Sequence, residues 1–311
     1  MSGLSSNHGD NRKQLRAEIQ QLDALSTAPA ILMPLLDMMR LPSEKIRLER
    51  VIQLVSYDSA IAAQCLRLAN SPLFGTRCIE TVHTAVMAIG LERVRSILLG
   101  LCMHRMIPES KWVIAPDAFW RHALGCALVT QQMAERIEYS EPGKAYLAGL
   151  LHDVGFLVNS MLYTEKFREC LQSATEQHLP LHVVENQVLG FTHCESGQIL
   201  CEHWSLPPEF AKVSGSHHDV SLLPTAGPLA SLVHLSDLLC RTRSLGYGYD
   251  ELLHAEPGGV ASWQVLIHAC PALENLDIVG LTLDMERVME SIAATVESVF
   301  GARKGAATGE N

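Results

Sequence analysis

Histidine and aspartate side chains recur inside the apolar stretches of the second half of this chain. Seven of those between residues 122 and 237 form the candidate set: His122, the adjacent pair His152-Asp153, His193, the pair His217-His218 and Asp237. Such groups cost free energy in an apolar surrounding unless each is paired. Imidazole nitrogens and carboxylate oxygens are the usual ligands of zinc, manganese and iron(II). A divalent metal ion is the simplest partner that these residues could share, so we predict a metal site.

The spacing of these residues suits ligands carried by a helical bundle. His122 and His152 are 30 residues apart, which fits two antiparallel helices joined by a turn. On a helix the neighbours His152 and Asp153 would point about 100° apart, so one could serve a first ion while the other bridges toward a second. The pair His217-His218 is expected at a helix end, from which both rings can be aimed inward.

Other polar residues of this region have ordinary structural interpretations. A histidine on an apolar helix is more often a hydrogen-bonded core or helix-end residue, and we expect that role for His104, His178, His182, His203 and His234. Cys194 and Cys201 are interpreted as small core residues, as lone cysteines in apolar helices usually are. Glu185 precedes His193 and could orient that ring through a hydrogen bond, or could belong to a solvated face.

The elements that must position these residues are predicted to be helices throughout. Aromatic residues make up only 5% of the chain, while Leu and Ala are abundant, which favours helices over a β sandwich. The most apolar long stretch, Lys144 to Leu162, is predicted to be one core helix that bends after residues 153–155. Polar residues in its middle argue against a membrane span. Near the end of the chain, Asp284 to Phe300 has the pattern of an amphipathic helix.

We therefore expect an all-α protein in which an N-terminal helical subdomain packs on a multi-helix core. In chain order we predict a disordered tail, an N-terminal helical part, the core, a C-terminal helical extension and a second disordered tail, at residues 1–12, 13–107, 108–242, 243–300 and 301–311.

Composition and charge narrow the class of partner. The formal net charge is −10, which argues against nucleic acid, because gripping its backbone requires a basic surface. Nine cysteines without a C-x-x-C pair indicate a reduced, intracellular protein. The first residues lack the apolar segment of a signal peptide. We therefore expect a cytoplasmic protein that does not enter a membrane.

The order of the motifs resembles a known family. The segment LLHDVGFLV resembles the signature of the HD-domain phosphohydrolases. Over roughly residues 20–242 the flanking segments resemble, in the same order, the HDOD subgroup: YDSAIAAQCLRLANSPLFG, AVMAIGLERVRSILLG, FWRHALGCALVTQQMA, GFTHCESGQILCEHWSLPPEF, VSGSHHDV and LVHLSDLL. The resemblance implies an N-terminal helical subdomain packed on an HD-like core.

The resemblance also implies roles for the predicted ligands. Four residues match the positions that hold one metal ion in HD enzymes: His122, His152, Asp153 and Asp237. Asp153 would then be the bridging and catalytic carboxylate. Three more match the additional ligands of the two-metal HD-GYP phosphodiesterases: His193, His217 and His218. One or two divalent ions (Fe, Mn or Zn) are therefore expected.

Two departures separate this chain from the hydrolases that it resembles. The lysine expected after the HD pair is Phe156 here, and the segment Asp219-Val220-Ser221 lacks the G-Y-P element. A phenylalanine cannot neutralise a phosphate. We therefore favour a regulatory protein of bacterial signal transduction that binds a protein partner or a nucleotide second messenger. The alternative is a metal-dependent phosphohydrolase or phosphodiesterase acting on a nucleotide or a cyclic dinucleotide.

Overall fold

The computed structural model describes residues 3–22, 28–41, 45–74, 78–243, 245–247 and 260–300, with the backbone alone for 3–8 and 260–263. Within these residues every regular element is an α-helix or a short 3-10 helix. The prediction of an all-α fold is therefore confirmed. The predicted tail at 301–311 lies outside the described residues.

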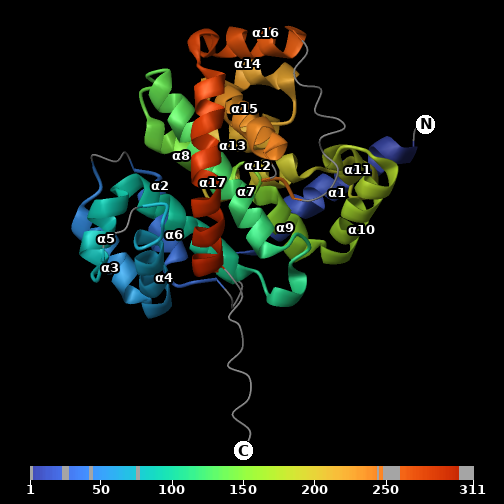
Figure 1. The fold of residues 1–311 in the computed structure, drawn as a ribbon. Coiled ribbons are helices and arrows are strands. Elements are labelled where there is room, and N and C mark those ends of the chain that lie inside the picture. The colour runs from blue at the N-terminus through green and yellow to red at the C-terminus, as the bar shows by residue number, and fades with distance from the viewer. Residues whose placement is uncertain are drawn as a thin grey trace, which may run out of the picture.

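The N-terminal part is a group of short helices. They are α1 (Gly3–Ile19), α2 (Leu32–Met39), α3 (Leu48–Tyr57), α4 (Ser59–Ala69), α5 (Val82–Ile89) and α6 (Leu91–Met106). Figure 1 shows α2 to α6 gathered on one side of the molecule. The carboxylate of Asp58 caps α4 by accepting hydrogen bonds from the backbone N–H groups of Ala60 and Ile61. The same carboxylate forms an ion pair with Arg105 of α6 at 2.6 Å. One residue thus starts a helix and ties it to its neighbour.

After α6 the chain forms the short 3-10 helix η3 (Glu109–Lys111), and the core begins beyond it. Its elements are α7 (Pro116–Arg136), α8 (Pro142–Leu151), α9 (Val154–Leu162), α10 (Thr164–Gln177), α11 (Leu181–Val188), α12 (His193–His203), α13 (Pro208–Ser216), η4 (Val220–Leu222), α14 (Leu223–Ala226) and α15 (Pro228–Thr242). The C-terminal elements are α16 (Val260–Ala269), η5 (Pro271–Asn275) and α17 (Ile278–Phe300).

The single helix expected over Lys144–Leu162 is divided in two. Helix α8 ends at Leu151 and α9 begins at Val154, because the backbone at Asp153 leaves helical geometry, with φ −99° and ψ 17°. By length and composition, Pro142–Leu162 is the one helical stretch in the described residues that could cross a membrane, but 94% of its most apolar window is buried. The stretch therefore serves as a core element, and its break coincides with the HD pair.

Two glycines allow helices of the core to approach one another closely around this break. A Cβ atom on Gly149 would lie 2.6 Å from the carbonyl oxygen of Cys126 on α7. A Cβ atom on Gly155 would lie 1.8 Å from the carbonyl oxygen of His193 on α12. Both obstacles are backbone atoms, which cannot swing aside. The glycines thus bring α7 and α12 against the HD pair.

We expect Gly155→Ala to destabilise the fold because the added methyl group would force α9 away from α12. Overpacking of this kind costs about 1–3 kcal/mol and more where the backbone must shift. Urea denaturation followed by circular dichroism measures the change. The control is Gly9→Ala on α1, where a Cβ atom meets nothing within 4 Å and where alanine should be neutral or stabilising. Equal stability of both variants would contradict this account of α9 packing.

The N-terminal segment departs from expectation. Residues 1–12 are predicted to be disordered, but α1 begins at Gly3. Asn11 donates a hydrogen bond to the carbonyl oxygen of Leu189 at 2.8 Å, and Arg12 pairs with Glu195 at 2.6 Å. These partners lie far along the chain, so a reading of local polarity could not reveal them. The structure places residues 3–12 in this helix.

The C-terminal helix α17 connects the two parts of the fold. It begins at Ile278, earlier than the predicted Asp284, and runs along α7 (Figure 1). Its last residue, Phe300, stacks on Trp120 of α7 with ring centroids 4.4 Å apart. The carbonyl oxygen of Val299 accepts a hydrogen bond from Gln64 of α4 at 3.2 Å. The helix therefore contacts both the core and the N-terminal group.

Candidate metal centre

The structure brings all seven predicted ligands together at the centre of the core. Helix α7 carries His122, the break between α8 and α9 carries the HD pair, and α12 begins with His193. The pair His217-His218 directly follows α13, and Asp237 lies on α15. All of these side chains are buried except that of His218, which is 14% exposed.

The candidate ligand atoms form a first group around one oxygen of Asp153. Oδ2 of Asp153 lies 3.0 Å from Nε2 of His152 and 3.5 Å from Nε2 of His122. The Nε2 atoms of His122 and His152 are 3.3 Å apart. Oδ1 of Asp237 lies 3.2 Å from Nε2 of His122. We call these residues, His122, His152, Asp237 and the Oδ2 side of Asp153, the first half-site.

The other oxygen of Asp153 faces a second group. Its Oδ1 atom lies 3.1 Å from Nε2 of His217 and 3.5 Å from Nε2 of His193. The ring of His218 packs beside both, with centroids 4.1 Å from His217 and 5.0 Å from His193. We call His193, His217, His218 and the Oδ1 side of Asp153 the second half-site. A carboxylate that faces two ligand groups with separate oxygens has the geometry of a bridging ligand.

These separations match those of atoms bound to a common ion. With metal–ligand bonds of about 2.0–2.1 Å, nitrogen and oxygen ligands at tetrahedral angles lie about 3.3 Å apart. The distances from the carboxylate oxygens of Asp153 to the four neighbouring histidine Nε2 atoms are 3.0–3.5 Å. The distance between the Nε2 atoms of His122 and His152 falls in the same range. The donor set therefore fits a divalent cation without rearrangement.

The outer nitrogens of four rings are already engaged. Their Nδ1 atoms lie 2.6–2.9 Å from oxygen acceptors: His122 with Leu245 O, His152 with Gly149 O, His217 with Ser214 O and His193 with Glu185 Oε2. A ring that donates from Nδ1 presents the lone pair of Nε2 inward. Inward lone pairs at such distances repel one another unless a cation lies between them. The hydrogen bond from His193 to Glu185, one of the two alternatives considered for Glu185, is among the four.

The electrostatics of the cluster favour positive charge between the rings. Burial by itself lowers the pKa of His122, but the carboxylates of Asp237 and Asp153 raise it to about 9. Burial also lowers the pKa of His217, but Cys194 and Asp153 raise it to about 10. Burial raises the pKa of Asp153, yet the adjacent histidines hold it well below its ordinary value. The carboxylates therefore stabilise a cation here, whether a proton or a metal ion.

Comparison with known proteins places this chain in a family. The HDOD domain model matches residues 25–220. The chain belongs to the HDOD domain family. This HDOD chain is 26% identical over 229 residues to an uncharacterized protein of Treponema pallidum (strain Nichols), over 70% of this chain and 43% of that relative. It thus spans less than half the length of the relative.

Solved structures share the fold of this HDOD protein. An HDOD domain protein of unknown function from Geobacter sulfurreducens is 25% identical, with a TM-score of 0.73 over 94% of this chain and 99% of that one. A candidate signal transduction protein from Marinobacter aquaeolei VT8 is 22% identical, with a TM-score of 0.74 over 94% of this chain and 66% of that one.

Phe156 forms an apolar wall beside the second half-site of the HDOD protein. Its side chain is 1% exposed, and its ring lies 4.1 Å from that of His193. It also packs edge-on against Tyr247, at 5.2 Å between centroids. A lysine at this position would bring an ammonium group to the ligands. The phenylalanine instead excludes charge and water from this side of the cluster.

Three residues at the site were not found from the sequence. The hydroxyl group of Tyr247 donates a hydrogen bond to Oδ2 of Asp153 at 2.5 Å. Arg241 pairs with Asp237 one helical turn away. His234, assigned an ordinary structural role, reaches the carbonyl oxygen of His217 with Nδ1 at 2.6 Å. The spacing of Arg241 to Asp237, i to i+4 on one helix, was a usable signal, whereas Tyr247 follows a loop and offers none.

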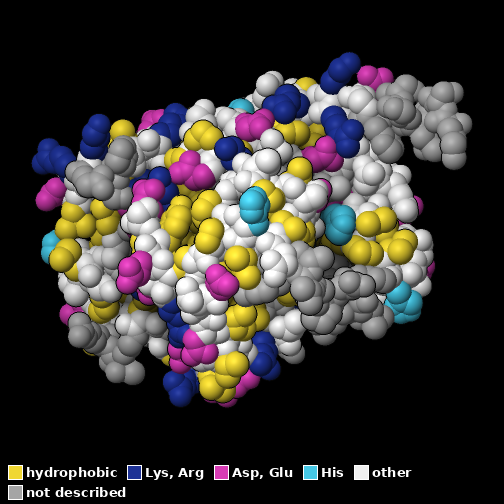
Figure 2. Space-filling view, turned by 90° about the horizontal axis from the view of Figure 1, so that it is seen from above, with side chains coloured by type: hydrophobic (Ala, Val, Ile, Leu, Met, Phe, Trp, Pro, Cys, Tyr) yellow, Lys and Arg dark blue, Asp and Glu magenta, His cyan; other side chains and the backbone are white. Residues whose placement is uncertain are grey.

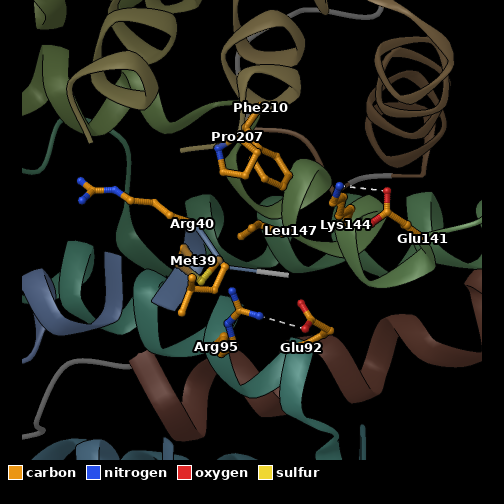
Figure 3. Close-up of a pocket in the computed structure, with 10 residues that line it drawn as sticks. Met39, Arg40, Glu92, Arg95, Glu141, Lys144, Leu147, Pro207 and Phe210 are labelled. Atoms are coloured by element: carbon orange, nitrogen blue, oxygen red, sulfur yellow. Dashed lines mark hydrogen bonds and ion pairs between the residues drawn. The ribbon is translucent and has the colours of Figure 1, made fainter. Parts of the chain in front are cut away.

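A separate cavity of about 220 Å³ lies where α2 and α6 face α8 and the start of α13 (Figure 3). Charged side chains line it. Figure 3 shows Arg95 paired with Glu92 and Lys144 paired with Glu141, each at 2.9 Å. Because these cations already have carboxylate partners, the cavity has little capacity to bind an anion. We interpret it as a gap in the packing between the N-terminal helices and the core.

We expect Glu185→Gln to weaken metal binding at the second half-site. The carboxylate of Glu185 accepts from both Nδ1 and the backbone N–H of His193, at 2.6 and 2.9 Å. An amide lowers the basicity of that ring, and loss of such a partner typically costs about 10–100-fold in affinity. Competition with a chromophoric zinc chelator measures the change. The control is Glu176→Gln on the exposed face of α10, and an unchanged affinity in Glu185→Gln would contradict the orienting role.

Proposed function

We propose that this HDOD protein is a regulatory module of bacterial signal transduction that retains an HD-type metal centre. In this proposal the seven candidate ligands hold one or two divalent ions (Fe, Mn or Zn), and the protein binds a protein partner or a nucleotide second messenger. The observation that carries the proposal is a complete ligand set combined with the apolar side chain of Phe156 next to it. All nine cysteines are free, which supports a cytoplasmic location.

The surface supports a protein partner over nucleic acid. In the face shown in Figure 2, Lys and Arg side chains are interspersed with Asp and Glu, and neither sign dominates among the described residues. A groove that follows a phosphate backbone would need clustered cations. The net charge of −10 opposes such an interaction further.

Phe156 separates binding from hydrolysis in this proposal. A bound ion would polarise a phosphate and activate a water molecule. Hydrolysis also requires that charge developing on the phosphate be stabilised by positioned cations. Beside His193 this chain offers a phenyl ring instead, at 4.1 Å between centroids. We therefore infer that a phosphorylated ligand would be held at the centre without efficient turnover.

The second candidate function is that of a metal-dependent phosphohydrolase or phosphodiesterase. The bridging geometry of Asp153 favours it, because two ions held on one carboxylate form the usual clamp for an in-line displacement. In that role Asp153 would be the catalytic carboxylate, and the substrate would be a nucleotide or a cyclic dinucleotide.

The two functions are distinguished by metal analysis together with assays of binding and turnover. The protein is purified without chelators, and its metal content is measured by elemental analysis. Hydrolysis of bis-p-nitrophenyl phosphate and of cyclic dinucleotides is followed, and calorimetry measures binding of the same dinucleotides. The variant carrying both His152→Ala and Asp153→Ala is the control.

We expect bound metal in the wild-type protein and turnover no higher than in the double variant. Metal-dependent turnover that the double variant loses would establish the hydrolase instead. Failure of the protein to take up Fe, Mn or Zn, even on reconstitution, would reject the metal centre and both functions that depend on it.

A further inference from the structure

The two half-sites differ in the negative charge that they offer to an ion. The first contains Asp237 in addition to its share of Asp153, at 3.2 Å from Nε2 of His122. Among the described residues, the second contains three histidines and its share of Asp153. Oδ2 of Asp237 lies 3.7 Å from Nδ1 of His218, but it is paired with Arg241. Glu185 adds no ligand there, because its carboxylate lies behind the ring of His193, on Nδ1. A dication in the second half-site would therefore lack an anionic ligand of its own.

The thiol of Cys194 occupies the place of that missing ligand. It follows His193 at the start of α12, and its Sγ atom lies 3.6 Å from Nε2 of that ring. The Sγ atom also lies 4.0 Å from Nδ1 of His217, the outer nitrogen of that ring, which contacts Ser214 O. Donor atoms of His193, Cys194, His217 and His218 all lie within 4.8 Å of one another. The side chain is only 7% exposed. Cys194 was expected to be a core residue, but it faces three imidazoles.

The separation of sulfur and nitrogen fits a shared zinc ion. With Zn–S bonds of about 2.3 Å and Zn–N bonds of about 2.0–2.1 Å at a tetrahedral angle, the two ligand atoms lie about 3.6 Å apart. The distance from Sγ of Cys194 to Nε2 of His193 is 3.6 Å. Thiolate is a soft ligand that favours zinc over manganese or magnesium.

Cys126 has a similar position at the first half-site but a different surrounding. Its Sγ atom lies 3.4 Å from Nε2 of His122 on the same helix. That half-site already has two carboxylates, from Asp153 and Asp237, to balance a dication. A thiolate there would add a third negative group beside them. Arg241 pairs with Asp237 and offsets part of this charge, so the comparison rests on the number of anionic ligand atoms. That number favours ligation by Cys194 and not by Cys126.

We propose that Cys194 is a thiolate ligand of the ion in the second half-site, and that it makes this half-site selective for zinc. The inference rests on the metal centre of the proposed function. Binding breaks the S–H bond, forms a bond from sulfur to the metal and releases one proton to solvent. The first half-site then offers two carboxylates, and the second offers a thiolate. Because the two ligand sets differ, the protein binds two different ions, or it binds the same ion at the two half-sites one after the other.

Cobalt(II) titration of the full chain tests this assignment without an activity assay. Cobalt replaces zinc and gives visible d–d bands at any protein site, while a thiolate ligand adds a charge-transfer band in the near ultraviolet. The variants are Cys194→Ser and Cys194→Ala, and the controls are Cys126→Ser and Cys201→Ser. Cys201 is a matched control because it is buried on the same helix and belongs to none of the ligand clusters among the described residues. Circular dichroism confirms that each variant is folded.

We expect the charge-transfer band in the wild type and in both controls, and its complete loss in the two Cys194 variants. Zinc affinity of the second half-site should fall at least tenfold in Cys194→Ser, while manganese affinity changes little. A wild type with d–d bands but no charge-transfer band would overturn the Cys194 assignment and leave the metal centre standing. A band that persists in the Cys194 variants and disappears in Cys126→Ser would also overturn it. Failure of the protein to retain cobalt in elemental analysis would overturn the metal centre itself.

Discussion

Replacement of Asp153 by asparagine is expected to remove tightly bound metal from the protein. The carboxylate contacts His152 and His122 with one oxygen and His217 with the other, at 3.0–3.5 Å. An amide retains one oxygen and presents an NH2 group, which cannot ligate a metal, to the other half-site. Breaking a buried charge interaction of this kind costs about 3–5 kcal/mol, or roughly a hundredfold to several thousandfold in affinity. Elemental analysis after dialysis, together with zinc competition, measures the loss.

Two further variants make the result for Asp153 specific. Asp219→Asn changes an exposed carboxylate just after the ligand pair His217-His218, and it should leave the metal content unchanged. Asp237→Asn should weaken the first half-site more than the second. Its Oδ1 atom contacts His122 and His152 of the first half-site, whereas its Oδ2 atom lies 3.7 Å from His218 and pairs with Arg241. If Asp153→Asn retained the metal content of the wild type, Asp153 would not be the bridging ligand.

Replacement of Trp120 by alanine is expected to cause the largest loss of stability. The side chain is 1% exposed and stacks on Phe300 at 4.4 Å, with the rings 9° from parallel. Its indole N–H donates to Nδ1 of His104 at 3.0 Å. Removing a buried tryptophan leaves a cavity and costs about 3–5 kcal/mol. Urea denaturation should show this decrease in the free energy of unfolding, and α17 should separate first, because it loses its anchor on α7.

The comparison variants for Trp120 separate packing from hydrogen bonding. Trp120→Phe keeps an aromatic ring for Phe300 and loses the N–H group, so it should be less destabilising than alanine. Tyr57→Ala removes a side chain that is 78% exposed and should change stability by no more than about 0.5 kcal/mol. A cost for Trp120→Ala as small as that for Tyr57→Ala would contradict the role of α17 as a connecting helix.

The class of fold and the set of candidate ligands were predictable because both are expressed in local patterns. Helical periodicity in Asp284 to Phe300 predicted most of α17, and Leu- and Ala-rich segments predicted the rest of the bundle. Polar residues within apolar helices drew attention to His122, His152 and Asp237, because burial of such groups requires partners. The position of Glu185 before His193 was likewise enough to suggest their hydrogen bond, which is 2.6 Å long.

The details that define the centre depend on contacts between distant parts of the chain. The break at Asp153 is one, since Gly155 lets α9 approach α12 and the polar pair sits between two helix ends. Tyr247 is another, because it reaches Asp153 from a position 94 residues further along the chain. Local polarity at residues 1–12 suggested disorder, whereas partners at Leu189 and Glu195 accompany a helix there.

The sequence alone determined that this protein is helical, and it singled out the histidines and aspartates that are candidate metal ligands. The family resemblance already implied that they divide into two groups with Asp153 between them. Only the tertiary structure decided that Tyr247 reaches Asp153 and that Cys194 lies against His193. The physical reason is that side-chain periodicity records which residues are buried. It does not record which buried residues meet, because that depends on how closely the helices pack and on where each one ends.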